Sequence, residues 1–111
     1  KETVLSTDAI MVRNLLGTIQ YWSQGAQMLY GWEPKEVLGA SAHQLLKTEF
    51  PVPLKAIEEA LRVNGHWEGS LIHERRDGSK VTVISSWHLQ QNPTALGQSI
   101  TVVEVNGEIQ S

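Results

Sequence analysis

The chain has 111 residues, of which 41% are hydrophobic and 19% are charged, as is ordinary for one soluble globular domain. Its formal net charge of −3 argues against the basic surface that nucleic acids and anionic membranes attract. The lack of cysteine excludes disulfides, thiolate metal sites, cysteine nucleophiles and flavin–cysteinyl photochemistry.

No apolar run approaches the roughly 20 residues of a membrane span, and no signal peptide is visible. The chain opens at Lys1 without a methionine and stops at Ser111, which indicates a segment of a longer protein. We therefore expect a cytoplasmic domain with no direct membrane contact and no nucleic-acid partner, in a parent whose own membrane anchoring is left open.

The first half of the chain reads as two strands and a block of short helices. Alternating patterns predict strands at 8–14 and 18–22, joined by a tight turn. Ser23 is an expected N-cap and Gly31 an expected C-cap of the helix between them. Further helices are predicted at 33–39 and 41–46, and an amphipathic one with 3–4 apolar spacing at 54–63.

The second half reads as sheet. Strands are predicted at 67–75 and 80–89, with a hairpin turn at Asp77-Gly78-Ser79, and a final strand at 98–105 after a longer loop at 90–97. Hairpins and not crossovers join these strands, which indicates an α+β fold with an antiparallel sheet. We expect one domain over 1–111, with 1–7 the remnant of an N-terminal flank and 106–111 the start of a C-terminal linker.

Four motifs occur in order over nearly the whole chain: Gly17–Ala26, then Leu29–Trp32 with Glu36–Gly39, then Gly65–Gly69 and Arg75–Ser79. Together they resemble the PAS domain family of bacterial signal-transduction proteins. The resemblance implies a five-stranded antiparallel sheet, with short helices between its second and third strands, that cups a pocket. It also implies a non-enzymatic sensory or relay module.

The resemblance favours a sensor histidine kinase as parent, with an output module on the same chain that reads ligand or partner binding. A cyclic-dinucleotide enzyme or a transcriptional regulator is the alternative parent. A second class stays open, in which the domain binds no small molecule and serves as a dimerisation scaffold. A free-standing enzyme lacks support, since no nucleophile with its base, carboxylate pair or phosphate loop is visible.

The candidate pocket comes from strand alternation matched to the family motif. The inward set is expected to be Val81, Val83, Ser85 and Trp87, and the outward set to include Ile84. A hydroxyl beside an indole could hydrogen-bond a small ligand. The favoured interpretation is that Trp87 itself fills the space and Ser85 makes room for it. The candidate lining for an unknown ligand is Leu54, Ile57, Leu61, Val83, Ser85 and Trp87.

Two cofactors that the family uses fit poorly. The oxygen-sensing haem members carry an axial histidine on the long helix, and no histidine lies between Pro51 and Asn64. A cysteine-adduct flavin is excluded by composition, whereas the identity of any other cofactor stays unknown.

The remaining polar residues favour no metal or catalytic site. The four histidines are expected mostly at the surface or at strand edges, without acidic partners at ligand spacing. On the outer face of the sheet, Ile72 and Ile84 suggest a cover. We expect a flanking helix or a homodimer partner to supply it.

Overall fold

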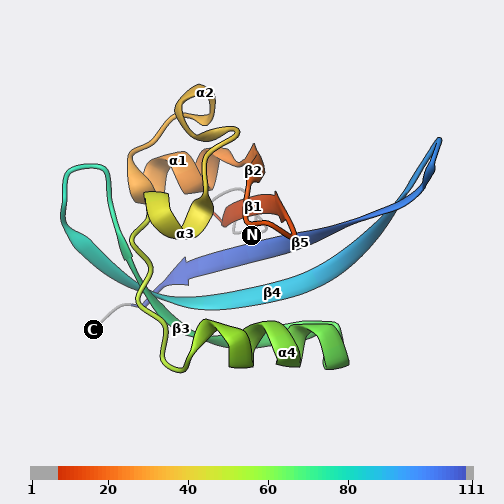
Figure 1. Cartoon of the computed structure of the whole chain (residues 1–111). Helices are drawn as coiled ribbons and strands as arrows, with labels where there is room; N and C mark the ends of the chain where they lie inside the picture. Colours follow the sequence, from red (N-terminus) through yellow and green to blue (C-terminus); the bar gives the residue numbers. More distant parts are fainter. Residues whose placement is uncertain (1–7, 110–111) are drawn as a thin grey trace, which may run out of the picture.

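The computed structural model describes residues 8–109, which form one antiparallel sheet with helices packed at its two ends (Figure 1). The elements are β1 (Ala9–Asn14), β2 (Ile19–Trp22), α1 (Gln24–Tyr30), α2 (Pro34–Val37), α3 (Ala42–Leu45), α4 (Leu54–Asn64), β3 (His66–Glu74), β4 (Lys80–Thr94) and β5 (Gly97–Glu108). The strand order is β2-β1-β5-β4-β3, so the first and last strands of the sequence lie side by side at the centre. The predicted fold class is confirmed.

Local sequence signals explain where the first elements begin and end. The Ser23 hydroxyl accepts a hydrogen bond from the Ala26 amide at 3.1 Å and so caps α1, as predicted. Gly31 ends that helix in the left-handed conformation, with φ of 84°. The Asp77 carboxylate accepts a hydrogen bond from the Ser79 amide at 2.9 Å and closes the β3–β4 turn.

The inner face of the sheet carries the core. Along β4, Val81, Val83, Ser85 and Trp87 are buried, and the alternate residue Ile84 is 44% exposed, as the alternation predicted. Helix α4 contributes two buried residues to the same core, Ile57 and Leu61. The largest fully buried apolar side chains are Trp87, Tyr30, Met11, Ile19, Leu46, Ile57 and Leu71.

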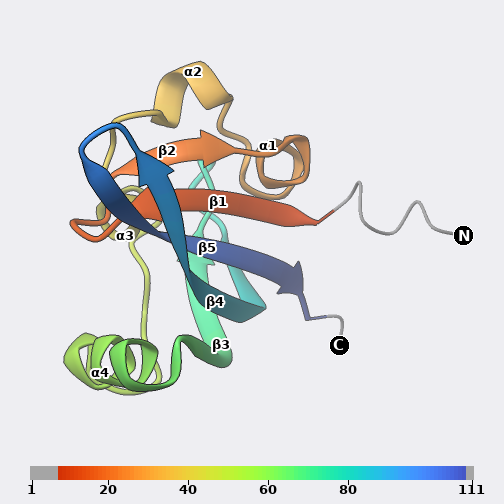
Figure 2. The same ribbon diagram turned by 90° about the vertical axis from the view of Figure 1, so that its right-hand side faces the viewer.

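The helices divide into two groups, as the two ribbon views show together (Figure 2). Helices α1 and α2 pack beside β1 and β2, whereas α4 packs against β3 and β4 at the other end of the sheet. Between these two groups, α3 brings His43 against Trp87 on the inner face. None of the helices in the described range is long and apolar enough to cross a bilayer.

The predicted loop at 90–97 is instead the tip of a long hairpin that projects from the body (Figure 1). β4 and β5 stay paired out to Thr94↔Gly97, so the turn is only Ala95-Leu96. Pro93 suggested a loop, but it lies beyond the last β3–β4 pair, His66↔His88. A missing backbone N–H is tolerated at such an edge.

The predicted end of the last strand at Val105 is also wrong, because β5 continues to Glu108. Asn106 pairs with both Ala9 and Ser85, so residues 106–108 belong to the sheet and not to a linker. The proposed flank at 1–7 and the final residues 110–111 lie outside the described residues.

Candidate functional site

A cavity of about 440 Å³ lies between α4, the β1–β2 turn and the inner face of β4 and β5. That volume lies within the range of small-molecule pockets, roughly 300–1,000 Å³. Its walls are mainly apolar, and the polar groups that reach it are Arg13 and Asn14 from β1 and His43 from α3. Glu58 and Arg62 of α4 also border it. The apolar wall is formed by Leu54, Leu61, Trp87, Leu89, Ile100 and Val102.

The six residues that the sequence suggested for the pocket fall into two groups. Leu54, Leu61 and Trp87 line the cavity. Ile57, Val83 and Ser85 are fully buried but lie in the packed core beside it, not on its wall. The structure therefore keeps a space next to Trp87, although Trp87 itself is only 1% exposed.

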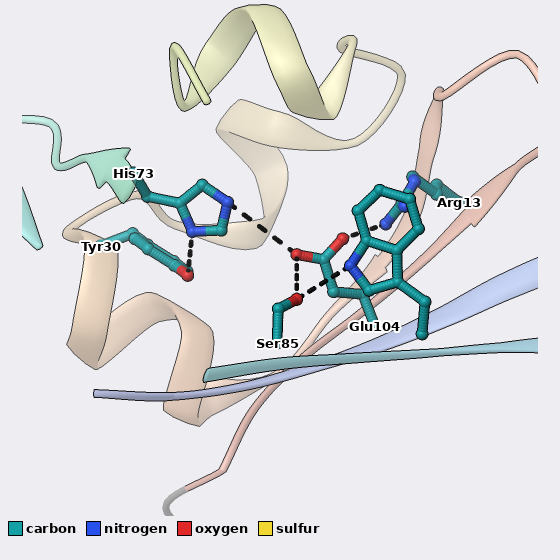
Figure 3. A network of polar contacts seen from close by, with 6 residues as sticks. Arg13, Tyr30, His73, Ser85 and Glu104 are labelled. Carbon is teal, nitrogen blue, oxygen red and sulfur yellow. Dashed lines mark hydrogen bonds and ion pairs between the residues drawn. The ribbon is translucent and has the colours of Figure 1, made fainter. Parts of the chain in front are cut away.

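A buried ion pair joins Arg13 of β1, on the cavity wall, to Glu104 of β5, which lies behind that wall (Figure 3). The two side chains are 3% and 1% exposed. The Arg13 guanidinium also lies 4.2 Å from the centroid of the Trp87 ring, a cation–π contact that is strongest where water is excluded. The strands place the pair directly, because β1 and β5 are neighbours and Met11 pairs with Glu104.

Ser85 joins this ion pair to Trp87. Its hydroxyl donates to Glu104 Oε2 at 3.2 Å and accepts from Trp87 Nε1 at 2.8 Å. A buried hydroxyl and a buried indole N–H are thus both satisfied. Ser85 therefore fixes the Trp87 ring, a role that neither sequence reading of this residue contained.

A second branch of the network runs from Glu104 to α1 (Figure 3). His73 Nε2 lies 3.9 Å from Glu104 Oε2, and its Nδ1 lies 2.6 Å from the Tyr30 hydroxyl. If the tyrosine hydroxyl donates to Nδ1, the neutral tautomer carries its proton on Nε2, towards Glu104. Five elements of the fold, β1, α1, β3, β4 and β5, thus meet in one polar cluster.

The pKa values of the cluster indicate one dominant charge state at neutral pH. Burial raises the pKa of Glu104, but Arg13 and then His73 lower it by more, so it lies below its usual value and the carboxylate is ionised. Burial lowers the pKa of His73, and Arg13 lowers it further against the pull of Glu104. Burial and the Glu104 charge hold the pKa of Tyr30 well above its usual value.

His43 is the histidine that contacts both the cavity and Trp87. Its ring stacks on the Trp87 ring, with centroids 5.7 Å apart and an interplanar angle of 17°. Burial, followed by the charge of Arg13, lowers the pKa of His43 to about 4. The ring is therefore neutral at neutral pH.

The expectation that most histidines lie at the surface is wrong for two of the four. His73 is 1% exposed, and His43 is half-buried with its ring stacked on Trp87. His66 and His88 do form an exposed cross-strand pair. The sequence did show that His73 lies on the same side of its strand as Leu71, which is buried. Its neighbour Glu104 lies on β5, far away in the sequence, so the contact itself was not visible. Within residues 8–109, no three potential ligands group as a metal site would require.

Two cofactors of the family each need a particular residue. Helix α4 carries no histidine to match the axial ligand of the oxygen-sensing haem members, and among the described residues His43 brings an imidazole to the cavity wall from a different helix. No cysteine exists to form a flavin adduct.

Comparison with solved structures gives the fold a wide set of relatives. A PAS domain of a protein from Colwellia psychrerythraea is 24% identical, with a TM-score of 0.74 over 93% of this chain and 86% of that one. The blue-light photoreceptor Aureochrome1 LOV domain in its light state is 18% identical, with a TM-score of 0.74 over 99% and 89% of the two chains. The LOV domain of a blue-light activated histidine kinase from Erythrobacter litoralis EL346 is 14% identical, with a TM-score of 0.71 over 93% and 96%.

At these identities the likeness concerns the fold. No curated protein sequence matches the chain. A sequence profile described as a PAS domain matches residues 7–105, which includes every helix and all but the last three residues of the final strand. This chain belongs to the PAS domain family.

Proposed function

We propose that this PAS domain senses a small molecule in the cavity beside Trp87 and relays its binding to an output module of a cytoplasmic signalling protein. PAS domains are generally sensory modules without catalysis of their own, and the resemblance favours a sensor histidine kinase as parent. The observation that carries the proposal is the cavity itself, an apolar space with a buried charged side chain, Arg13, on its wall.

The position of the cavity supports a relay through the sheet. Its wall includes Arg13 of β1, Trp87 of β4 and Val102 of β5, which are the three central strands. A ligand that contacts Arg13 also acts on Glu104, because the two form one ion pair. Binding that favours one arrangement of these strands shifts the population of states that the output module reads.

Native mass spectrometry of the purified domain, compared with its denatured mass, tests the proposal. A reproducible extra mass under native conditions is expected, and it should disappear in Leu61→Trp, which fills the cavity. Val63→Trp is the matched control, since Val63 lies on the same helix but is 62% exposed. An extra mass that survives Leu61→Trp contradicts the proposal. So does a bare protein mass that stays unchanged after the domain has been incubated with a metabolite extract.

A second candidate function, dimerisation, is favoured by the outer face of the sheet. Apolar residues pair across β1 and β5 there, as Ile10↔Val105 and Val12↔Val103. On β4, the exposed Ile84 pairs with Gly107 and so lies diagonal to Val105. Apolar residues on a solvent face indicate a cover, and a second copy of this chain is the cover we propose.

Sedimentation velocity tests the dimer. The domain is expected to sediment as a dimer at micromolar concentration, and Ile84→Glu is expected to give a monomer. Val63→Glu on the exposed side of α4 is the control and should leave the dimer intact. A monomeric wild type, or an Ile84→Glu variant that stays dimeric, refutes this interface.

A further inference from the structure

The buried guanidinium of Arg13 has more donors than its protein partners use. Arginine carries five N–H donors, and only the bond from Nη1 to Glu104 is made. Within residues 8–109, no other protein acceptor takes a hydrogen bond from this side chain, although it is 3% exposed. Since Arg13 also lines the cavity, its remaining donors are available to a molecule bound there. These donors are not among the fully buried atoms without a partner, so water in the cavity can reach them. A ligand that displaces this water without accepting hydrogen bonds would lose them, so the cavity favours a ligand that accepts hydrogen bonds.

The charges around the cavity decide whether that acceptor is an anion. Arg13 is already neutralised by Glu104, which stays ionised. His43 is neutral, and at the cavity edge Arg62 is paired with Glu59, which leaves the Glu58 carboxylate there. The cavity therefore has no excess positive charge to attract an anion. An anion on Arg13 would lie beside the Glu104 carboxylate in a space of low dielectric, where like charges repel strongly.

The rest of the wall fixes the body of the ligand. Leu54, Leu61, Leu89 and Val102 present apolar surface, and Trp87 presents an aromatic ring. Arg13 is the buried charged donor among them, so the ligand needs one acceptor at one end and apolar surface elsewhere.

We propose that the cavity binds an uncharged, largely apolar molecule through a carbonyl-type oxygen that accepts hydrogen bonds from the Arg13 guanidinium. This inference rests on the proposed function, because it names the ligand class of that same cavity. The proposed ligand is therefore not a carboxylate, although an arginine in a pocket would by itself suggest a carboxylate ligand.

Three probes of similar size isolate the acceptor: acetophenone, ethylbenzene and benzoate carry a ketone, no acceptor and a carboxylate on the same ring. Each is titrated into the domain and followed by two-dimensional amide NMR, in which the indole N–H signal of Trp87 reports on the cavity. Because a hydrogen bond to a charged donor is worth a factor of about ten or more, acetophenone is expected to bind about tenfold more tightly than ethylbenzene. Benzoate is expected to bind more weakly than acetophenone.

The variant Arg13→Met/Glu104→Gln removes the donor without leaving a buried charge. In it the advantage of acetophenone over ethylbenzene is expected to disappear, while ethylbenzene keeps its affinity within about twofold, because its apolar contacts are unchanged. Should this variant fail to fold, the ratio of the three affinities in the wild type still decides the matter.

The outcomes separate this inference from the proposed function. Equal binding of acetophenone and ethylbenzene, tighter binding of benzoate, or a ketone preference that survives in the double variant overturns the ligand class but leaves the cavity a binding site. Failure of every probe to shift Trp87, together with a bare native mass, overturns both.

Discussion

The Arg13–Glu104 pair yields the most demanding prediction for stability. Arg13→Met leaves Glu104 buried, 1% exposed, without its ion-pair partner and with the Ser85 hydroxyl as a remaining hydrogen-bond donor. Breaking a buried pair from one side costs about 3–5 kcal/mol, because an uncompensated charge is left in the interior. A domain of this size has a free energy of unfolding of about 5–15 kcal/mol, so the single variant should lose a large part of it.

The double variant Arg13→Met/Glu104→Gln separates the cost of the stranded charge from the value of the pair. It holds no buried charge, and the amide oxygen of glutamine can still accept from Ser85. It is expected to lose less than about 2 kcal/mol, because replacing both members of a buried pair is often nearly neutral. Urea unfolding at neutral pH, followed by circular dichroism, gives both values. A single variant that loses under about 1 kcal/mol, or a double variant as unstable as the single one, would refute the reasoning.

Two further predictions concern pH and a close contact. Because the pKa of His43 falls from 6.5 to about 4 on folding, the unfolded chain binds the extra proton between these values, and stability is lost as the pH falls through that window. The free energy of unfolding falls by up to roughly 3 kcal/mol across this window, and urea titrations should show a smaller fall in His43→Phe. If the free energy of unfolding depends on pH equally in both proteins, His43 is not the group responsible. Gly69→Ala places a Cβ 2.5 Å from the Trp67 ring and should cost about 1–3 kcal/mol and alter the near-ultraviolet dichroism. Gly107→Ala, whose Cβ meets nothing within 4 Å, should do neither, and equal effects at both positions count against the packing argument.

Sequence patterns predicted the parts of the fold whose signals are local. The alternation along β4 placed Val83 and Trp87 inside and Ile84 outside, and Ser23 and Gly31 marked the ends of α1. In each case the deciding residues lie within a few positions of one another, so a repeat or a cap suffices to read them. The family motifs supplied the number of strands and the place of the short helices between the second and third of them, whereas the order of the strands in the sheet came from the structure.

The polar cluster could not be predicted in the same way, because its members are far apart in the sequence. Arg13 and Glu104 are 91 residues apart, and Tyr30 and His73 are 43 apart. Each charged residue alone is expected at the surface. The sequence did contain one usable signal. Arg13 is two residues from the buried Met11, and Glu104 is two residues from the buried Val102, so strand alternation points both charged side chains inward. Because the two strands are neighbours, one buried charge of each sign could have been expected to pair.

The same ion pair links the two surfaces for which functions are proposed. Arg13 lies on the cavity wall of β1, and on the opposite face of that strand Val12 lies beside Val103 in the apolar outer surface. Since successive residues of a strand point to opposite faces, any shift of β1 that a ligand on Arg13 favours also moves Val12 relative to β5. Packed interfaces respond to such shifts by changing between discrete arrangements. Ligand binding and dimerisation should therefore be coupled, and the dimer dissociation constant should differ between ligand-free and acetophenone-saturated protein but not in Arg13→Met/Glu104→Gln. Sedimentation velocity over a dilution series measures this, and equal constants in the wild type would show that the sheet does not transmit the signal between its two faces.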